Sequence, residues 1–520
     1  MKKIFFTLFA GLMVSAQVMA VSVAEVCGQY NGNLNIGGQQ YPNKTICLLP
    51  GTVQNTVTFV LPDFTYNAGK LGDIVLTNIP MDANGKLTLE GATLYLDAID
   101  ERATINVVNG LEEGGVVYNS VLSATQAQVL LSIAAPSLPE PIFVLFNGNT
   151  AAGKNYALTN GGFEGSWTNY EPKGWHSFWT ATGVLIDFIK ANDQFMQSTN
   201  KRPGSKGSYS AFLSSKFALS AKANGNCTNG QINAGSSTAD DPANNFNFSD
   251  PTNTGYNTPF QGHPDSIVFW AQYIPADKNP GNAVNKARMH TVITTNARYQ
   301  DPEADGDYSQ VKIAEATINY AANASMGWQR FSVPFEYNAQ AQSKDPAYIL
   351  VTFTTNMTPG GGSSYYEGGK FDKTNYLDTL YLDDVQLIYS RAMSKFTVND
   401  QAIRFTKGVA TIGSNYCDSC AAYAAQGYGK TAQTFIGCDA IHKCIYVYVI
   451  AEDYSQSKQY SLYRIDFADS QTDDLTPFFP EEGVEKVQGR TERFEKVLLN
   501  GQIYIRRGDV WYNMNGARIR

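Results

Sequence analysis

Aromatic side chains are concentrated in one short stretch, TNGGFEGSWTNYEPKGWHSFW, which spans residues 159 to 179. Trp167, Trp175 and Trp179 cannot all belong to a core, because Gly and Pro interrupt the stretch and no single strand face carries all three rings. Exposed flat rings stack on the apolar C–H faces of sugars, so these rings, with His176 among them, form the predicted carbohydrate-binding set. One of the tryptophans is nevertheless expected in the core.

A second stretch supplies polar groups of the kind that sugar hydroxyls need. Residues 224 to 250 read NGNCTNGQINAGSSTADDPANNFNFSD, and the Asn, Gln, Ser and Asp side chains in this run can donate or accept hydrogen bonds. The same composition is typical of a loop that only contacts solvent. Ligand binding and simple solvation therefore stay open as alternatives for this segment.

The acidic run DPEADGD, residues 301 to 307, places four carboxylates around one glycine, as at the start of an EF-hand calcium loop. Such a loop needs a carboxylate at its twelfth position, where this sequence has Lys312. We therefore expect a solvated turn here.

Catalytic patterns based on histidine or serine are absent. The 4 His residues are scattered without an HExxH pattern, and no GxSxG occurs. A glycoside hydrolase would need two carboxylates that flank a cleft, and Glu164, Glu171, Asp187 and Glu336 are the candidates. We expect a glycan-binding protein without catalysis; the alternatives are a glycoside hydrolase and an adhesive or structural surface protein.

The first twenty residues, MKKIFFTLFAGLMVSAQVMA, are typical of a cleaved secretory signal. No later apolar run is long enough to span a bilayer, so we expect no transmembrane span in the mature chain. Because 47 Asp and Glu face 39 Lys and Arg without a dense basic run, nucleic acid is excluded as a partner. We expect an exported protein, in the periplasm, at the cell surface or secreted, whose partner is a glycan or polysaccharide.

Export permits disulfides, and six of the 7 cysteines are expected to form them. The CxxC pattern at 417 to 420 precedes a second pair whose spacing does not fit a usual zinc knuckle. Another pair brackets the first predicted hairpin, which leaves Cys227 as a buried core thiol. The six are Cys27, Cys47, Cys417, Cys420, Cys438 and Cys444.

The pattern along the chain predicts an all-β, multidomain fold. Short runs of β-branched and aromatic residues alternate with polar ones and are separated by Gly, Pro, Asn and Asp. The stretch SCAAYAAQGYGKTAQ is the expected helical or loop excursion. The expected modules are a small barrel or sandwich at 25–147, a jelly-roll sandwich at 156–390, a smaller sandwich at 391–480 and a hairpin tail at 490–520.

Two of these modules resemble known families. CGQYNGNLNIGG and TVTFVLPDFTYNAGKLGDIVLTNIPMDANGKLTLEG resemble the calycin-like β-barrel domain of secreted bacterial proteins. NGGFEGSW, GWHSFW, PGSKGSYSAFLSS, HPDSIVFWAQY and LYLDDVQLIYS, in that order, resemble the family called the putative carbohydrate metabolism domain (PCMD). That resemblance implies a jelly roll akin to carbohydrate-binding modules.

The second resemblance also implies a structural calcium ion, held by carboxylates that meet where the first and last strands pair. Carried onto this sequence, the ligands would be Glu164 and Asp383, with Asp384 as the alternative. Asp383 shares strand parity with Val385 and Leu387, so it should point inward, where an unpaired charge is costly. The other possibility is that these acids lie at strand ends and face solvent.

Overall fold

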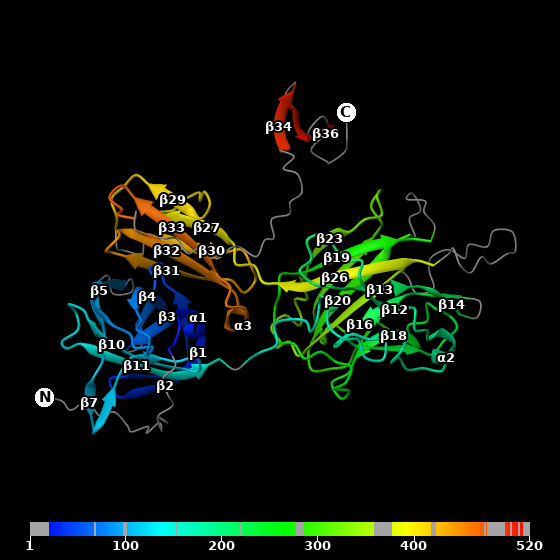
Figure 1. The fold of residues 1–520 in the computed structure, drawn as a ribbon. Coiled ribbons are helices and arrows are strands. Elements are labelled where there is room, and N and C mark those ends of the chain that lie inside the picture. The colour runs from blue at the N-terminus through cyan, green and yellow to red at the C-terminus, as the bar shows by residue number, and fades with distance from the viewer. Residues whose placement is uncertain are drawn as a thin grey trace. The chain divides into compact units, whose positions relative to one another are not determined.

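The structure, a computed structural model, confirms the all-β, multidomain fold (Figure 1). The chain divides into two compact units, Met1–Phe478 and Phe479–Arg520. Residues 1–19 of the predicted signal and Cys420 lie outside the described residues. The structure describes residues 20–66, 69–96, 101–151, 153–218, 221–276, 285–357, 377–417, 423–472 and 475, and the strands at 494–499, 502–507 and 510–512.

Helices are few and short in the described part of the chain. Each has 4 residues, and none has the length and apolarity needed to cross a membrane. They are α1 (Val23–Val26), α2 (Ile186–Ile189) and α3 (Tyr454–Ser457).

The N-terminal module is a nearly closed antiparallel barrel of eight strands (Figure 1). The strands at the two ends of the sheet contact each other, which nearly closes the barrel. In spatial order they are β4 (Gly69–Pro80), β3 (Thr56–Tyr66), β2 (Gln39–Pro50), β1 (Gly28–Ile36), β11 (Ile142–Thr150), β10 (Gln126–Ala134), β6 (Glu101–Val107) and β5 (Leu89–Leu96). The short strands β7 (Leu111–Glu113), β8 (Val116–Tyr118) and β9 (Val121–Leu122) complete this module.

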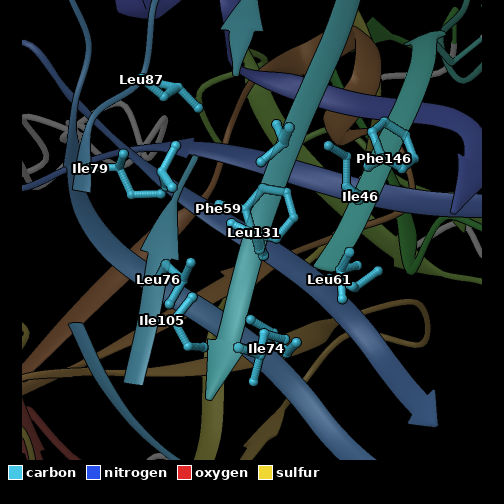
Figure 2. Packing of buried hydrophobic residues seen from close by; sticks show 14 of the residues in the cluster. Ile46, Phe59, Leu61, Ile74, Leu76, Ile79, Leu87, Ile105, Leu131 and Phe146 are labelled. Carbon is cyan, nitrogen blue, oxygen red and sulfur yellow. The ribbon is translucent and has the colours of Figure 1, made fainter. Parts of the chain in front are cut away.

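Apolar side chains fill the barrel. Alternation along β3 directs Val57, Phe59 and Leu61 inward, where they join one continuous buried cluster. Figure 2 shows this cluster, with Phe59 and Leu131 beside Ile46 and the other labelled side chains. Eight strands give a barrel an interior just wide enough for side chains to fill, and this cluster occupies it.

The second module is a sandwich of two antiparallel five-stranded sheets. Phe269 of one sheet and Phe353 of the other lie 5.1 Å apart between their ring centres, inside the core that the sheets share. The first sheet has the order β12 (Phe195–Ser198), β13 (Ser210–Ser214), β26 (Thr379–Ile388), β19 (Ser266–Ile274), β23 (Gln329–Pro334). The second sheet has the order β16 (Asn226–Thr228), β25 (Tyr348–Thr354), β20 (Ala287–Thr294), β22 (Lys312–Tyr320), β24 (Glu336–Tyr337).

A three-stranded sheet packs on the outer face of the second sheet. Tyr299 of the small sheet forms a buried cluster with Val292 and Leu350 of the large one. The small sheet consists of β17 (Gln231–Ala234), β18 (Asn245–Ser249) and β21 (Tyr299–Asp301). The strands β14 (Lys216–Ala218) and β15 (Ala221–Ala223) form a separate two-stranded sheet.

The third module has two small sheets, in which one strand pair, β29 (Val409–Ile412) with β33 (Ser461–Phe467), is parallel. The expected helical or loop excursion at 419–433 instead contains a strand, because residues 423–427 pair with a neighbouring strand and Tyr423 packs on Phe396. The sheets are β28 (Gln401–Ala402), β27 (Met393–Val398), β30 (Tyr423–Gly427) and β29 (Val409–Ile412), β33 (Ser461–Phe467), β32 (Cys444–Ile450), β31 (Gln433–Asp439).

The barrel and the third module share a buried core. Val60 points outward from β3 and joins a cluster with Tyr448 and Tyr454 of the third module. The Tyr454 hydroxyl donates a hydrogen bond to the carbonyl of Leu48 at 3.0 Å, and the hydroxyls of Thr58 and Tyr448 lie 3.0 Å apart. Both faces of β3 are therefore buried.

The second compact unit contains an antiparallel three-stranded sheet of short hairpins. Its strands are β34 (Phe494–Leu499), β35 (Gln502–Arg507) and β36 (Val510–Tyr512).

The cysteines of the predicted barrel pair are both buried, free thiols in the structure. Burial raises the pKa of Cys27 to about 12, with a smaller opposing effect from the nearby ammonium of Lys458. Cys417 and Cys444 are also free thiols, and Cys227 lies in the core of the second module as expected. The disulfides stay a prediction for the exported, oxidised protein.

Candidate functional site

The second module carries an open cleft of about 1050 Å³, open solvent at its mouth included. Its lining comes from the outer face of the second sheet (β16, β20 and β25), from the small sheet, from β15 and from α2 with the segment that precedes it. The cleft thus lies between elements that are far apart in the sequence.

Alternation along β20 decides which of its side chains reach the outer face. Ala287 and Met289 are fully buried in the core between the two sheets. Arg288 and His290 therefore point the other way, and Arg288 lines the cleft. Neither residue was predicted from the sequence. The pattern that could have identified them is a charged or polar side chain at alternate positions at the start of the run ARMHTVIT.

Apolar side chains form one part of the lining. Phe178, Phe188 and Phe246 contribute rings, and Phe188 on α2 is 55% exposed. The guanidinium of Arg298 lies 5.2 Å from the ring centre of Phe246, a favourable cation–π contact. An exposed ring that continues the apolar lining of a cleft is typical of a ligand-binding surface.

Three asparagine side chains in the lining have an amide oxygen without a hydrogen-bond partner: Asn226, Asn247 and Asn356. Asn247 and Asn356 are only 5% and 2% exposed. A buried acceptor left unpaired costs about 1 to 3 kcal/mol, so a donor supplied to any of these oxygens would be stabilising. Asn226 and Asn247 belong to the polar segment 224–250, which therefore contributes to the cleft.

A buried ion network includes part of the polar lining. The two carboxylate oxygens of Asp301 each accept a hydrogen bond from Arg288 at 2.8 Å, and Nδ1 of His290 lies 2.9 Å from Asp301 Oδ1. Burial would raise the pKa of Asp301, but the charges and hydrogen bonds of His290 and Arg288 hold it below its usual range. Burial would lower the pKa of His290, but Asp301 and Glu315, whose Oε2 lies 3.5 Å from Nε2 of His290, raise it. The expectation of a solvated turn is wrong for Asp301, because pairing with β18 and with these cations buries it.

Trp175, predicted as a sugar-stacking ring, is a core residue. It is 0% exposed and packs between Phe163 and Phe353, at 5.0 Å and 6.2 Å between ring centres. Its indole N–H donates to the carbonyls of Thr159 and Asn160 at 3.1 Å and 3.0 Å. The ring therefore has no face available for a ligand, and this part of the prediction is corrected.

The other predicted binding residues are half-buried. Trp167 packs on Phe195 at 4.8 Å between ring centres, and Trp179 packs on Tyr170 at 4.5 Å. His176 forms an isolated bridge with Thr228 of β16. Their contact with a glycan stays a prediction, and the residue of this aromatic stretch that lines the cleft is Phe178.

The loop that carries these residues is organised by one buried carboxylate. Glu171 accepts hydrogen bonds from the Ser177 N–H at 2.6 Å and from the Thr180 hydroxyl at 3.0 Å, and it lies 3.2 Å from Nδ1 of His176. These contacts occupy both carboxylate oxygens. Glu171 therefore positions the loop.

The acids of the predicted calcium site lie on the outer face of the first sheet. Leu382 is in the core, and Asp384 adopts a left-handed backbone with φ of 48° at a break in the β19–β26 register. Alternation places Asp383 on the face opposite to Leu382, and the bulge returns Val385 to the core face, so the parity that Asp383 was expected to share with Val385 is wrong. Asp383 is nevertheless buried there.

The surroundings of these acids decide how well they fit a cation. Asp384 is paired with the guanidinium of Arg202, and Glu164 accepts a hydrogen bond from the Tyr209 N–H at 3.0 Å. Oδ1 of Asp383 has no partner, and burial together with the charge of Asp384 raises the pKa of Asp383 to about 6. No three His, Cys, Asp or Glu side chains of the described chain converge as a metal site would require. Calcium at Glu164 and Asp383 stays a prediction, with Asp383 as the residue that fits.

The variant Asp383→Asn tests how the protonated and ionised forms of the Asp383 carboxyl group affect stability. A folded-state pKa above the unfolded value of about 3.9 means that the protonated form stabilises the fold at low pH, and that this stabilisation is lost as the pH rises through 6. With EDTA present, the variant should therefore unfold at a higher temperature than the wild type at pH 8, and at an equal temperature at pH 4.

If calcium binds Asp383, it should reverse the order of the two melting temperatures. Thermal unfolding at pH 8 with 5 mM calcium should then favour the wild type, because an ion that binds only the folded form stabilises it. The variant should not respond to calcium. A wild type that is equally indifferent to calcium and EDTA would contradict the calcium prediction.

Comparisons with known proteins give no family for this chain. No family model and no curated protein match it. A solved structure from Bacteroides fragilis, described as a putative outer membrane protein, shows 16% identity and a TM-score of 0.18 over 25% of this chain and 53% of its own. The chain thus spans about half the length of that protein. Carbohydrate-binding modules of the β-sandwich superfamily show 11% identity and a TM-score of 0.20 over 69% of this chain and 99% of theirs.

Proposed function

We propose that this chain is a non-catalytic glycan-binding protein and that the cleft of the second module holds the sugar. The observation that carries the proposal is the pairing of exposed aromatic surface, at Phe188, with buried amide oxygens that lack partners, at Asn247 and Asn356. A sugar ring has an apolar C–H face and a rim of hydroxyl donors, so it is complementary to both parts of this lining.

The carboxylates support binding over hydrolysis. Among the described residues that line the cleft, Asp301 is the one carboxylate, and its lowered pKa is the opposite of what a general acid needs. Glu171 is hydrogen-bonded within its loop, Asp187 is exposed on α2, and Glu336 lies on the edge strand β24. Hydrolysis is therefore an outcome that the binding experiment must test.

A glycan array probed with the purified full chain, followed by calorimetry on the oligosaccharides that bind, tests the proposal. Incubation of the same oligosaccharides with the protein should release no new reducing ends. Release that disappears when a carboxylate is replaced would establish a hydrolase instead, and an array without any bound glycan would refute glycan binding.

Phe188→Ala should weaken glycan binding about tenfold, since the loss of one stacking ring costs about 1.4 kcal/mol. The melting temperature should stay close to that of the wild type, because this side chain is 55% exposed. Calorimetry and thermal unfolding measure the two effects.

The matched control is Tyr428→Ala, which removes a 76% exposed ring from the third module. It should change neither property. Equal affinities of Phe188→Ala and Tyr428→Ala for the glycan would show that the ligand binds elsewhere on the chain.

A further inference from the structure

The cationic side chains that line the cleft are already paired with carboxylates. Arg288 makes its two 2.8 Å hydrogen bonds to Asp301. Lys222 forms a buried ion pair with Asp378, with side chains 5% and 3% exposed. In the described part of the lining, an incoming anion would therefore meet no cation that is free of a counter-ion.

Around these pairs the cleft presents hydrogen-bond acceptors. The unpaired amide oxygens of Asn226, Asn247 and Asn356 need donors, and the Asp301 carboxylate, paired with Arg288, adds no net charge to the same lining. A carboxylated or sulfated sugar would bring further acceptors into this site, where no cation is free to pair with its charge in the described part of the lining. An uncharged sugar brings hydroxyl donors.

We infer that the cleft selects uncharged, hydroxyl-rich glycans and rejects glycans that carry carboxylate or sulfate groups. The inference rests on the proposed function and names the ligand class of the same site. Asp301 is then a specificity-determining residue, because it neutralises the guanidinium that would otherwise attract acidic sugars, and His290 holds Asp301 in that position.

Matched pairs of polysaccharides test the inference with the full-length protein. Neutral glucans, mannans, galactans and xylans are compared with the same polymers after oxidation of primary hydroxyls or after sulfation, so that each pair shares its linkage. We expect at least tenfold tighter binding of the neutral member. Binding of that member should change less than twofold between 50 mM and 500 mM NaCl, since screening acts on charge attraction.

Asn247→Leu provides a second readout that does not depend on the charge pairs. It removes a buried acceptor without a partner, so it should weaken neutral-glycan binding about tenfold while the melting temperature stays equal or rises. Asn147→Leu, at an exposed position of β11 in the barrel, is the matched control and should leave binding unchanged.

The outcomes separate this inference from the proposed function. Tighter binding of the acidic members, or binding that collapses at 500 mM NaCl, would overturn the ligand class and leave glycan binding intact. An equal affinity of Asn247→Leu and Asn147→Leu would also overturn it. If no polysaccharide binds, both the ligand class and glycan binding fail.

Discussion

Trp175→Ala is expected to lower the free energy of unfolding of the second module by about 3 to 5 kcal/mol, the usual cost of truncating a buried tryptophan. The ring is 0% exposed, fills the space between Phe163 and Phe353, and donates to two backbone carbonyls. Its removal leaves a cavity and deprives both carbonyls of that donor. Denaturant-induced unfolding followed by fluorescence and circular dichroism measures the loss.

Trp179→Ala is the matched control because Trp179 lies in the same stretch and is half-buried. Its main described contacts are the ring of Tyr170 and the ammonium of Lys190, which lies 4.5 Å from the ring centre. We expect less than half the destabilisation seen for Trp175→Ala. A Trp175→Ala protein as stable as the Trp179→Ala protein would show that Trp175 is not in the core.

Asp301→Asn is expected to cost about 3 to 5 kcal/mol of stability, because it removes the buried carboxylate that pairs with both Arg288 and His290 and leaves Glu315, 3.5 Å from Nε2 of His290, as the remaining carboxylate. Asp250→Asn is the control: its carboxylate lies 3.9 Å from Arg298 Nε at a partly exposed site, where an ion pair contributes about 1 kcal/mol or less. Urea unfolding of both variants and the wild type measures the difference.

The pH dependence of the stability lost in Asp301→Asn tests whether Asp301, Arg288 and His290 form an ionised network. The lowered pKa of Asp301 stabilises the fold above the unfolded value of about 3.9, and this contribution is lost as the pH falls through the folded pKa. The raised pKa of His290 stabilises the fold below about 6.5, and that contribution is lost as the pH rises through its folded pKa. The penalty of Asp301→Asn should therefore be greatest between about pH 4 and 6.5. A penalty that does not vary with pH would contradict the ionised network.

Strand patterns allowed much of the fold to be predicted. Alternation in runs such as the one around Phe59 reports which side chains face a core, and that pattern is local in the sequence. The pattern does not report what covers the other face. Val60 and Thr58 on the same strand pack against the third module, so the barrel and that module share a core that no sequence window contains.

For the candidate site too, local sequence patterns supplied candidates for part of the lining, and tertiary packing decided the rest. The composition of residues 224–250 left ligand binding and simple solvation open, and in the structure Asn226 and Asn247 line the cleft. The binding residues predicted from the sequence included Trp175, which is buried, and did not include Phe188 or Arg288, which line the cleft. A tryptophan in a loop rich in Gly and Pro can turn inward or outward, and only packing against distant residues decides which.

By itself, the sequence determined the all-β class, through residue alternation that depends only on the two-residue period of a strand. It also determined the supply of amide and aromatic side chains. The tertiary structure alone decided that a bulge at Asp384 puts Asp383 and Val385 on opposite faces of their strand, and that Asp301 meets Arg288 and His290 between strands of two different sheets. The physical reason is that burial, pKa and ligand access depend on partners brought together by long-range pairing, and these contacts have no local signature.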